Sequence, residues 1–182
     1  MGDTAKIVWV LFGDMHDFEN AIPTLRTIYK GYEKNLQKKG YTLGIPEGLT
    51  SKRAFLSHIS DPFTWALVWH SHGEYNSFNQ PKGNIADKDG QVIRPSDVKV
   101  ASPNLHFVGL LGCGMAAQKT AWLQVFGLKK FNDSNRRLAG SGDYVCFGNC
   151  SIAWNYPQDF AESHRSNSLL PYNFKSWVSK LP

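Results

Sequence analysis

The sequence predicts an α/β protein with a mostly parallel sheet, and two observations lead to this fold class. Short apolar runs alternate with segments whose apolar residues recur at helical spacing, which is the pattern of strands joined by helices. Several of these runs are apolar almost throughout, as expected of strands buried on both faces. A chain of 182 residues has the size of one domain, so we expect residues 1–182 to form a single domain.

The first third of the chain should form three strands and two helices. Ile7–Phe12 is a near-continuous apolar run and predicts the first strand. Apolar residues then recur at helical spacing from Ile22 to Leu36, with Pro23 in the first turn and Gly40 as the stop. The next elements are a short strand at Tyr41–Ile45, a helix capped by Thr50 or Ser51 that reaches about Ile59, and a strand at Phe63–Trp69.

Beyond this point a hairpin comes before the next strand and helix. Asp89-Gly90 predicts a turn between the strand segments Gly83–Ala86 and Gln91–Ile93, and we interpret Asp87–Gly90 as a polar turn rather than a calcium loop. The elements that follow are a short helical segment from Pro95, a strand at Leu105–Leu111, a helix over about Met115–Phe126 and a strand at Tyr144–Phe147.

The composition indicates the cellular compartment and excludes some kinds of partner. The three cysteines are odd in number and form no CxxC pair, which argues against a disulfide framework and favours a reducing compartment. The first apolar run is too short for a secretory signal or a bilayer span, so we expect a cytoplasmic protein without a membrane segment. The net charge of +5 is modest and comes with no nucleic-acid-binding motif, so nucleic acid is not an expected partner.

Two of the predicted strands end in residues capable of nucleophilic catalysis. His70-Ser71-His72-Gly73 follows one strand, and Gly112-Cys113-Gly114 follows another. Ligand sites of open α/β sheets lie at the carboxyl ends of strands, where a thiol and an imidazole distant in sequence can meet. A thiol, an imidazole and backbone N–H groups are what cysteine hydrolysis requires. We therefore expect His72 and Cys113 to be catalytic, with the N–H groups of Gly73 and Cys113 as oxyanion donors.

The order of motifs between Phe63 and Gly114 resembles the core of the caspases and their relatives. Ser71-His72-Gly73-Glu74 follows an apolar strand, a loop containing Asp89-Gly90 comes next, and a second apolar strand ends at Cys113. His72 and Cys113 are 41 positions apart, near the roughly 50 of caspases. The resemblance implies a three-layer αβα sandwich with a mostly parallel caspase-like sheet. It places the proton acceptor on His72, an oxyanion glycine on Gly73 and the nucleophile on Cys113.

The resemblance also implies a cysteine endopeptidase that acts on protein or peptide substrates without a metal or organic cofactor. Caspases have Gln-Ala before the cysteine, whereas this chain has Leu111-Gly112, so specificity for Asp is not implied; Gly-Cys is more similar to separase and the CHAT-type relatives. In this family the loop after the first strand lines the specificity pocket, and here it contains Asp14 and Asp17. Together with Asp143, these carboxylates predict cleavage after Arg or Lys. A second interpretation is that Asp14 and Asp17 serve the start of the first helix.

Two other functions remain open from the sequence. One alternative to the cysteine endopeptidase is a catalytically silent caspase-like module that binds a regulatory partner protein. The other is a zinc metallopeptidase of the JAMM type. The second follows from the His70-Ser71-His72 motif, for which Asp87 would have to supply the carboxylate ligand.

Overall fold

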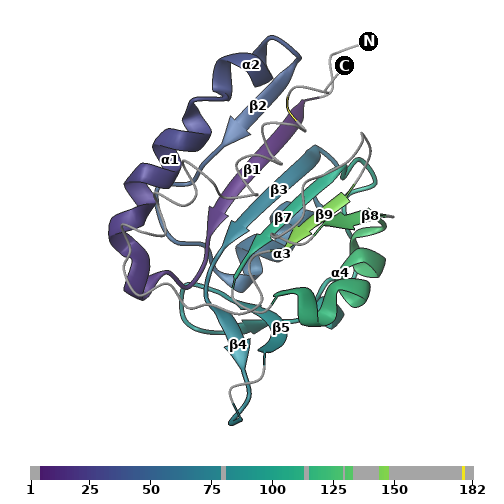
Figure 1. Cartoon of the computed structure of the whole chain (residues 1–182). Helices are drawn as coiled ribbons and strands as arrows, with labels where there is room; N and C mark the ends of the chain where they lie inside the picture. Colours follow the sequence, from purple (N-terminus) through teal and green to yellow (C-terminus); the bar gives the residue numbers. More distant parts are fainter. Residues whose placement is uncertain are drawn as a thin grey trace.

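The computed structural model, which describes residues 5–78, 81–112, 115–128, 130–132, 144–147 and 178, confirms an α/β protein with a mostly parallel sheet (Figure 1). The central sheet has the strand order β2-β1-β3-β7-β9-β8, and each pair of neighbours in it is parallel. Its strands are, in chain order, β1 (Lys6–Phe12), β2 (Tyr41–Gly44), β3 (Thr64–His70), β7 (Phe107–Leu111), β8 (Lys130–Asn132) and β9 (Tyr144–Phe147). Five of these six strands were predicted; β8 was not.

A second, smaller sheet lies beyond the carboxyl ends of the central strands (Figure 1). It consists of β4 (Gly73–Tyr75), β5 (Pro81–Ala86) and β6 (Val92–Ile93), paired antiparallel in that order. Ile85 lies opposite Ile93, which confirms the predicted hairpin. Its turn is held by the Asp87 carboxylate, which accepts the backbone N–H groups of Asp89 and Gln91 at 2.9 and 2.8 Å. The polar-turn interpretation of Asp87–Gly90 therefore describes this segment.

The predicted helices are present, but two of them are divided and η1 (His16–Ala21) was not predicted. The helix predicted over about Met115–Phe126 is a 3₁₀ segment, Met115–Gln118, followed by an α-helix, Lys119–Phe126. The helix predicted over Ile22–Leu36 is divided at Gly31, where the N–H of Tyr32 bonds to the carbonyl of Tyr29 in a tighter 3₁₀ turn. Glycine is a poor helix former, which explains the break. Ser51 caps the third helix by accepting the N–H of Ala54. The segments are η1 (His16–Ala21), α1 (Ile22–Lys30), α2 (Glu33–Gln37), α3 (Lys52–Ser60), η2 (Pro95–Asp97), η3 (Met115–Gln118) and α4 (Lys119–Phe126).

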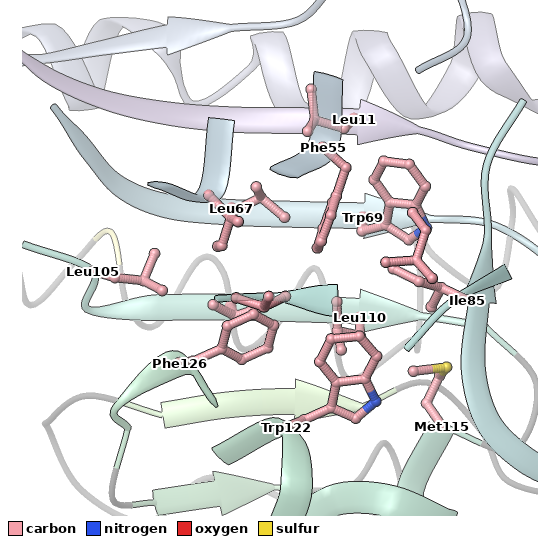
Figure 2. Packing of buried hydrophobic residues seen from close by; sticks show 14 of the residues in the cluster. Leu11, Phe55, Leu67, Trp69, Ile85, Leu105, Leu110, Met115, Trp122 and Phe126 are labelled. Atoms are coloured by element: carbon pink, nitrogen blue, oxygen red, sulfur yellow. The ribbon is translucent and has the colours of Figure 1, made fainter. Parts of the chain in front are cut away.

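Side chains of the central strands alternate between two buried clusters. The even-numbered residues of β1, from Val8 to Phe12, belong to the first cluster, together with Leu25 and Tyr29 of α1 and Leu36 of α2. The second cluster joins odd-numbered residues of β1 and β3 to α3 and α4, as Figure 2 shows for Leu11, Leu67, Trp69, Phe55, Trp122 and Phe126. Each face of the sheet thus has its own buried cluster, which explains why the strands are apolar almost throughout.

Two further sequence predictions concern the length of the helices and the position of His106. None of the helices within the described ranges is long and apolar enough to cross a bilayer. His106, predicted to lie inside a strand, instead precedes β7; its N–H bonds to the carbonyl of Trp65 and its ring stacks on the Trp65 indole at 4.6 Å.

Candidate active site

The backbone holds His72 at the carboxyl end of β3. The N–H of Ser71 continues the pairing of β3 with β7 by bonding to the carbonyl of Leu111 at 2.9 Å. The next residue leaves the sheet, because the N–H of His72 bonds at 2.8 Å to the carbonyl of Asp14 in the loop after β1. His72 is therefore fixed between the ends of three neighbouring strands, with its side chain partly exposed.

The Ser71 hydroxyl organises this turn further. It accepts the indole N–H of Trp69 at 2.9 Å and lies 3.3 Å from the backbone N–H of Ala86, and it donates to the carbonyl of His72 at 2.8 Å. Ser71 is buried, so these bonds are sheltered from water. One hydroxyl thus connects the end of β3 to the end of β5.

Cys113 and Gly114 lie outside the described residues, but the residue before them is described. A Cβ atom built on Gly112 would lie 3.1 Å from the carbonyl oxygen of Ser71 and 3.5 Å from the backbone nitrogen of Gly73. The chain leaving β7 therefore runs directly against the segment that contains His72. Glycine at position 112 leaves room for this approach.

The strand register relates the two candidate catalytic residues. β3 and β7 are adjacent and parallel, and His70 lies opposite Leu111. His72 and Cys113 each come two positions after this pair in the chain. The chain therefore leaves both strands at the same edge of the sheet, which is where an open α/β sheet places its ligand sites.

Of the three predicted substrate-binding carboxylates, the structure brings Asp14 to this edge. Its carbonyl accepts the N–H of His72, and its own N–H bonds to the carbonyl of Ala86 at 3.0 Å. The side chain is 20% exposed, and its Oδ1 atom accepts the N–H of His16, the first residue of η1, at 3.3 Å. Asp14 thus contributes to the start of the helix, as the second interpretation expects, while lying beside His72. The side chain of Asp17 and the whole of Asp143 lie outside the described part of the chain.

His70 has a different environment from His72. Its side chain is fully buried, its Nε2 atom lies 3.0 Å from the hydroxyl of Tyr29, and its ring stacks on Phe12 at 5.2 Å. Asp87, the carboxylate that a zinc site would need, binds backbone N–H groups, including that of Lys52 at 2.7 Å. Within the described ranges, no three His, Cys, Asp or Glu side chains are grouped to hold a metal ion. These contacts assign His70 and Asp87 to the scaffold.

Glu74 follows the candidate oxyanion glycine and forms a charged pair. Its Oε1 atom lies 2.8 Å from the Nζ atom of Lys82, and its Oε2 atom accepts the side-chain amide of Asn84 at 2.7 Å. These hydrogen bonds, from Lys82 first and then Asn84, hold the pKa of Glu74 below its ordinary value of 4.5. The carboxylate therefore stays ionised and anchors the β4–β5 hairpin.

A cavity of about 380 Å³ lies beside the site rather than at it. Its lining comes from η1, α1 and the loop after β2, which all follow the carboxyl ends of β1 and β2. Two carboxylates, Glu19 and Glu47, are among the lining residues, and Arg26 donates to the carbonyl of Pro46 at 2.7 Å. The remaining lining residues are Ile22, Pro23, Gly48 and Leu49.

The histidine of this turn is predictable from the sequence, whereas the residues that hold it are not. Ser71 is part of both sequence motifs, and a serine at the end of a buried strand needs hydrogen-bond partners, but the sequence does not identify those partners. Asn84 and Ala86 gave no signal, because their roles depend on contacts between distant segments.

These observations define an α/β protein whose candidate site lies at the carboxyl edge of a mostly parallel sheet. The sequence matches no protein-family model and no curated protein.

Proposed function

We propose that the protein is a cysteine endopeptidase with a His72–Cys113 dyad, built on a three-layer αβα sandwich of the caspase-like type. The parallel pairing of β3 with β7, with Gly112 against Ser71 and Gly73, carries the proposal. It supports a thiol and an imidazole at one edge of the sheet. The buried clusters on both faces of the sheet support the three-layer arrangement.

The proposed reaction needs no group beyond the dyad, the backbone and water. His72 accepts the thiol proton, and the Cys113 thiolate attacks the scissile carbonyl carbon to form a C–S bond. The N–H groups of Gly73 and Cys113 stabilise the developing oxyanion. The C–N bond then breaks, and the leaving amine takes the proton from His72. Water attacks the acyl-enzyme with His72 as base, the C–S bond breaks, and the thiol is regenerated with its proton.

The substrate class we propose is a polypeptide with Arg or Lys before the scissile bond. The backbone carbonyl of Asp14 accepts the N–H of His72, which supports a role for the Asp14 carboxylate in binding that side chain. A carboxylate that is only 20% exposed attracts a cation more strongly than one in bulk water.

To test the dyad, the protein is labelled with a thiol-reactive peptide probe, and its hydrolysis of a peptide library is measured. We expect Cys113→Ala and His72→Ala to lower hydrolysis about 10³-fold or more, because both residues act in one proton-transfer unit. The labelled cysteine is identified by mass spectrometry. His16→Ala is the matched control, because the His16 side chain is exposed and lies at the start of η1, outside the proposed dyad.

Three outcomes would contradict the proposal. Activity that survives Cys113→Ala but is lost with a zinc chelator would favour the metallopeptidase. A folded protein that neither reacts with the probe nor cleaves any peptide would favour the catalytically silent binding module. A loss of activity in His16→Ala equal to that in His72→Ala would show that His72 has no special role.

A further inference from the structure

Strand β5 touches the turn that contains His72. The carbonyl of Ala86, its last residue, accepts the N–H of Asp14 at 3.0 Å. The N–H of Ala86 lies 3.3 Å from the Ser71 hydroxyl, which also binds the carbonyl of His72. The carboxyl end of β5 is thus part of the framework around His72.

The middle of the same strand touches the segment that follows Cys113. The indole N–H of Trp122 in α4 donates to the carbonyl of Gly83 at 2.8 Å, and the side-chain amide of Gln118 in η3 donates to Oδ1 of Asn84 at 2.8 Å. Gln118 also donates to the carbonyl of Lys82. Gly83 has a φ of 69°, and a Cβ atom there would lie 2.7 Å from the backbone nitrogen of Gln118. Only glycine permits this close packing of strand and helix.

Buried side chains join the same elements. Figure 2 shows Trp69 of β3, Ile85 of β5 and Met115 of η3 gathered at one end of the second cluster. β5 is therefore packed between the end of β3 and the beginning of the helical segment after Cys113.

The side-chain amide of Asn84 has a second partner, Glu74, which fixes its orientation. Its amide nitrogen donates to Oε2 of Glu74 at 2.7 Å, while its amide oxygen accepts from Gln118. Asn84 is 4% exposed, so neither bond has much competition from water. The chain Glu74–Asn84–Gln118 runs from the residue after Gly73 to a residue five positions beyond Cys113.

We propose that Asn84 and Gln118 are positioning residues that fix η3, and through it the chain around Cys113, relative to the turn that contains His72, with Glu74 fixing the orientation of the Asn84 amide. This inference rests on the proposed dyad. Both residues act by fixing the separation of the thiol and the imidazole. Rate depends steeply on that separation, because proton transfer requires hydrogen-bond reach.

The test is Asn84→Asp, which places a carboxylate against Glu74 and removes the amide donor while changing the volume little. The readout is the rate at which iodoacetamide alkylates Cys113, measured against pH with the modified peptide identified by mass spectrometry. In the wild type we expect a Cys113 pKa below the ordinary value of about 8.5. In Asn84→Asp we expect that pKa to rise by about one unit, so that alkylation near neutral pH slows about tenfold.

A compensating pair distinguishes positioning from general damage. Combining Asn84→Asp with Glu74→Gln reverses the direction of the first hydrogen bond, since the introduced amide donates to the introduced carboxylate, which still accepts from Gln118. We expect the double variant to recover most of the wild-type alkylation profile. Gln118→Met, which removes the donor on a partly exposed residue, should shift the pKa in the same direction as Asn84→Asp even if the latter fails to fold.

Asn104→Asp is the control, because the Asn104 amide donates to the carbonyl of Pro62, which precedes β3 at the opposite end of that strand. It should leave the profile unchanged. One outcome is that His72→Ala raises the Cys113 pKa while folded Asn84→Asp and Gln118→Met leave it unchanged. In that case the positioning role of Asn84 and Gln118 is wrong, and the proposed dyad is supported. If His72→Ala leaves the Cys113 pKa unchanged, the dyad is wrong, and positioning with it.

Discussion

Gly13 lies where the loop after β1 passes an indole ring and the end of another strand. Its N–H bonds to the carbonyl of His70 at 2.8 Å. A Cβ atom at this position would overlap both the ring of Trp69 and the carbonyl oxygen of Ala86. Because one of these neighbours is backbone and the other is a fully buried side chain, neither can yield cheaply.

We therefore expect Gly13→Ala to lower the free energy of unfolding by about 3 kcal/mol, the upper range for overpacking a buried site. Urea unfolding measures this directly. Gly48→Ala is the matched control, since a Cβ atom there would meet nothing within 4 Å, and it should change stability by about 0.5 kcal/mol or less. If the urea midpoints of the two variants are equal, the loop after β1 can shift to make room for the added Cβ atom.

The specificity assigned to Asp14 is tested by Asp14→Asn. The substitution keeps the carbonyl that binds the N–H of His72 and a side-chain oxygen for His16, but removes the negative charge. We expect kcat/KM for peptides with Arg or Lys before the scissile bond to fall about tenfold, and values for uncharged residues to change little. Glu19→Gln serves as the control, because Glu19 is also beside His16 but is 59% exposed. An unchanged preference in Asp14→Asn would exclude this pocket assignment.

At the scale of elements, the β5–β6 turn is joined to a helix by one carboxylate. Asp87 is 1% exposed and accepts three backbone N–H groups, from Asp89, Gln91 and Lys52. Lys52 begins α3, so the negative charge also faces the N-terminal end of that helix, where it is favoured by the helix dipole. The small sheet and α3 are therefore stabilised together.

Asp87→Ala should lower the free energy of unfolding by about 3 kcal/mol, because it leaves buried N–H groups without an acceptor. Asp89→Ala in the same turn should cost about 0.5 kcal/mol or less, since Asp89 is 52% exposed and its ion pair with Lys88 is at the surface. Urea unfolding of the two variants provides the comparison. Similar losses would indicate that the turn is stabilised by its overall charge rather than by these hydrogen bonds.

The ion pair between Glu74 of β4 and Lys82 makes the stability of the protein sensitive to acid. Since Lys82 and Asn84 hold the pKa of Glu74 below 4.5, the folded protein favours the ionised carboxylate more than the unfolded chain does. Its contribution to stability is full above pH 4.5 and is lost as the pH falls through the folded-state pKa.

We therefore expect the stability difference between the wild type and Glu74→Gln to shrink as the pH is lowered from about 6 to about 3. Urea unfolding at several pH values measures it. Lys82→Met, which removes the first partner, should move the acid transition of the wild type to higher pH. A difference that stays constant with pH would show that the Glu74 carboxylate has no preferred state in the fold.

At the scale of the molecule, the sequence predicted the strands that are buried on both faces. β1, β3 and β7 are near-continuous apolar runs, and burial alone is enough to predict them. β4 and β8 have three residues each and did not stand out, because so short a strand depends on its partner rather than on its own pattern. The helix division at Gly31 was missed since one glycine does not interrupt apolar spacing.

In the candidate site, too, only the features marked by a local sequence pattern could be predicted. Placing His72 at a strand end required only the apolar run before it and the glycine after it. The contacts of Ser71 with Ala86, and of Asn84 with Gln118, join segments 15 and 34 positions apart, so no local pattern contains them. Their discovery required the three-dimensional arrangement.

The parallel sheet also has a kinetic consequence. Each pairing between β1, β2, β3 and β7 closes a long loop, with Lys6 beside Tyr41 and Ala66 beside Phe107, whereas the β5–β6 hairpin closes a short one. Chains rich in distant contacts fold slowly, so the hairpin should form early and the framework around His72 late. During refolding, hydrogen-exchange protection of the Asp87 N–H, which bonds to the carbonyl of Gln91 inside the hairpin, should therefore precede the return of the native alkylation rate of Cys113. The protein would pass through a stage in which the hairpin is formed and the thiol is still unreactive.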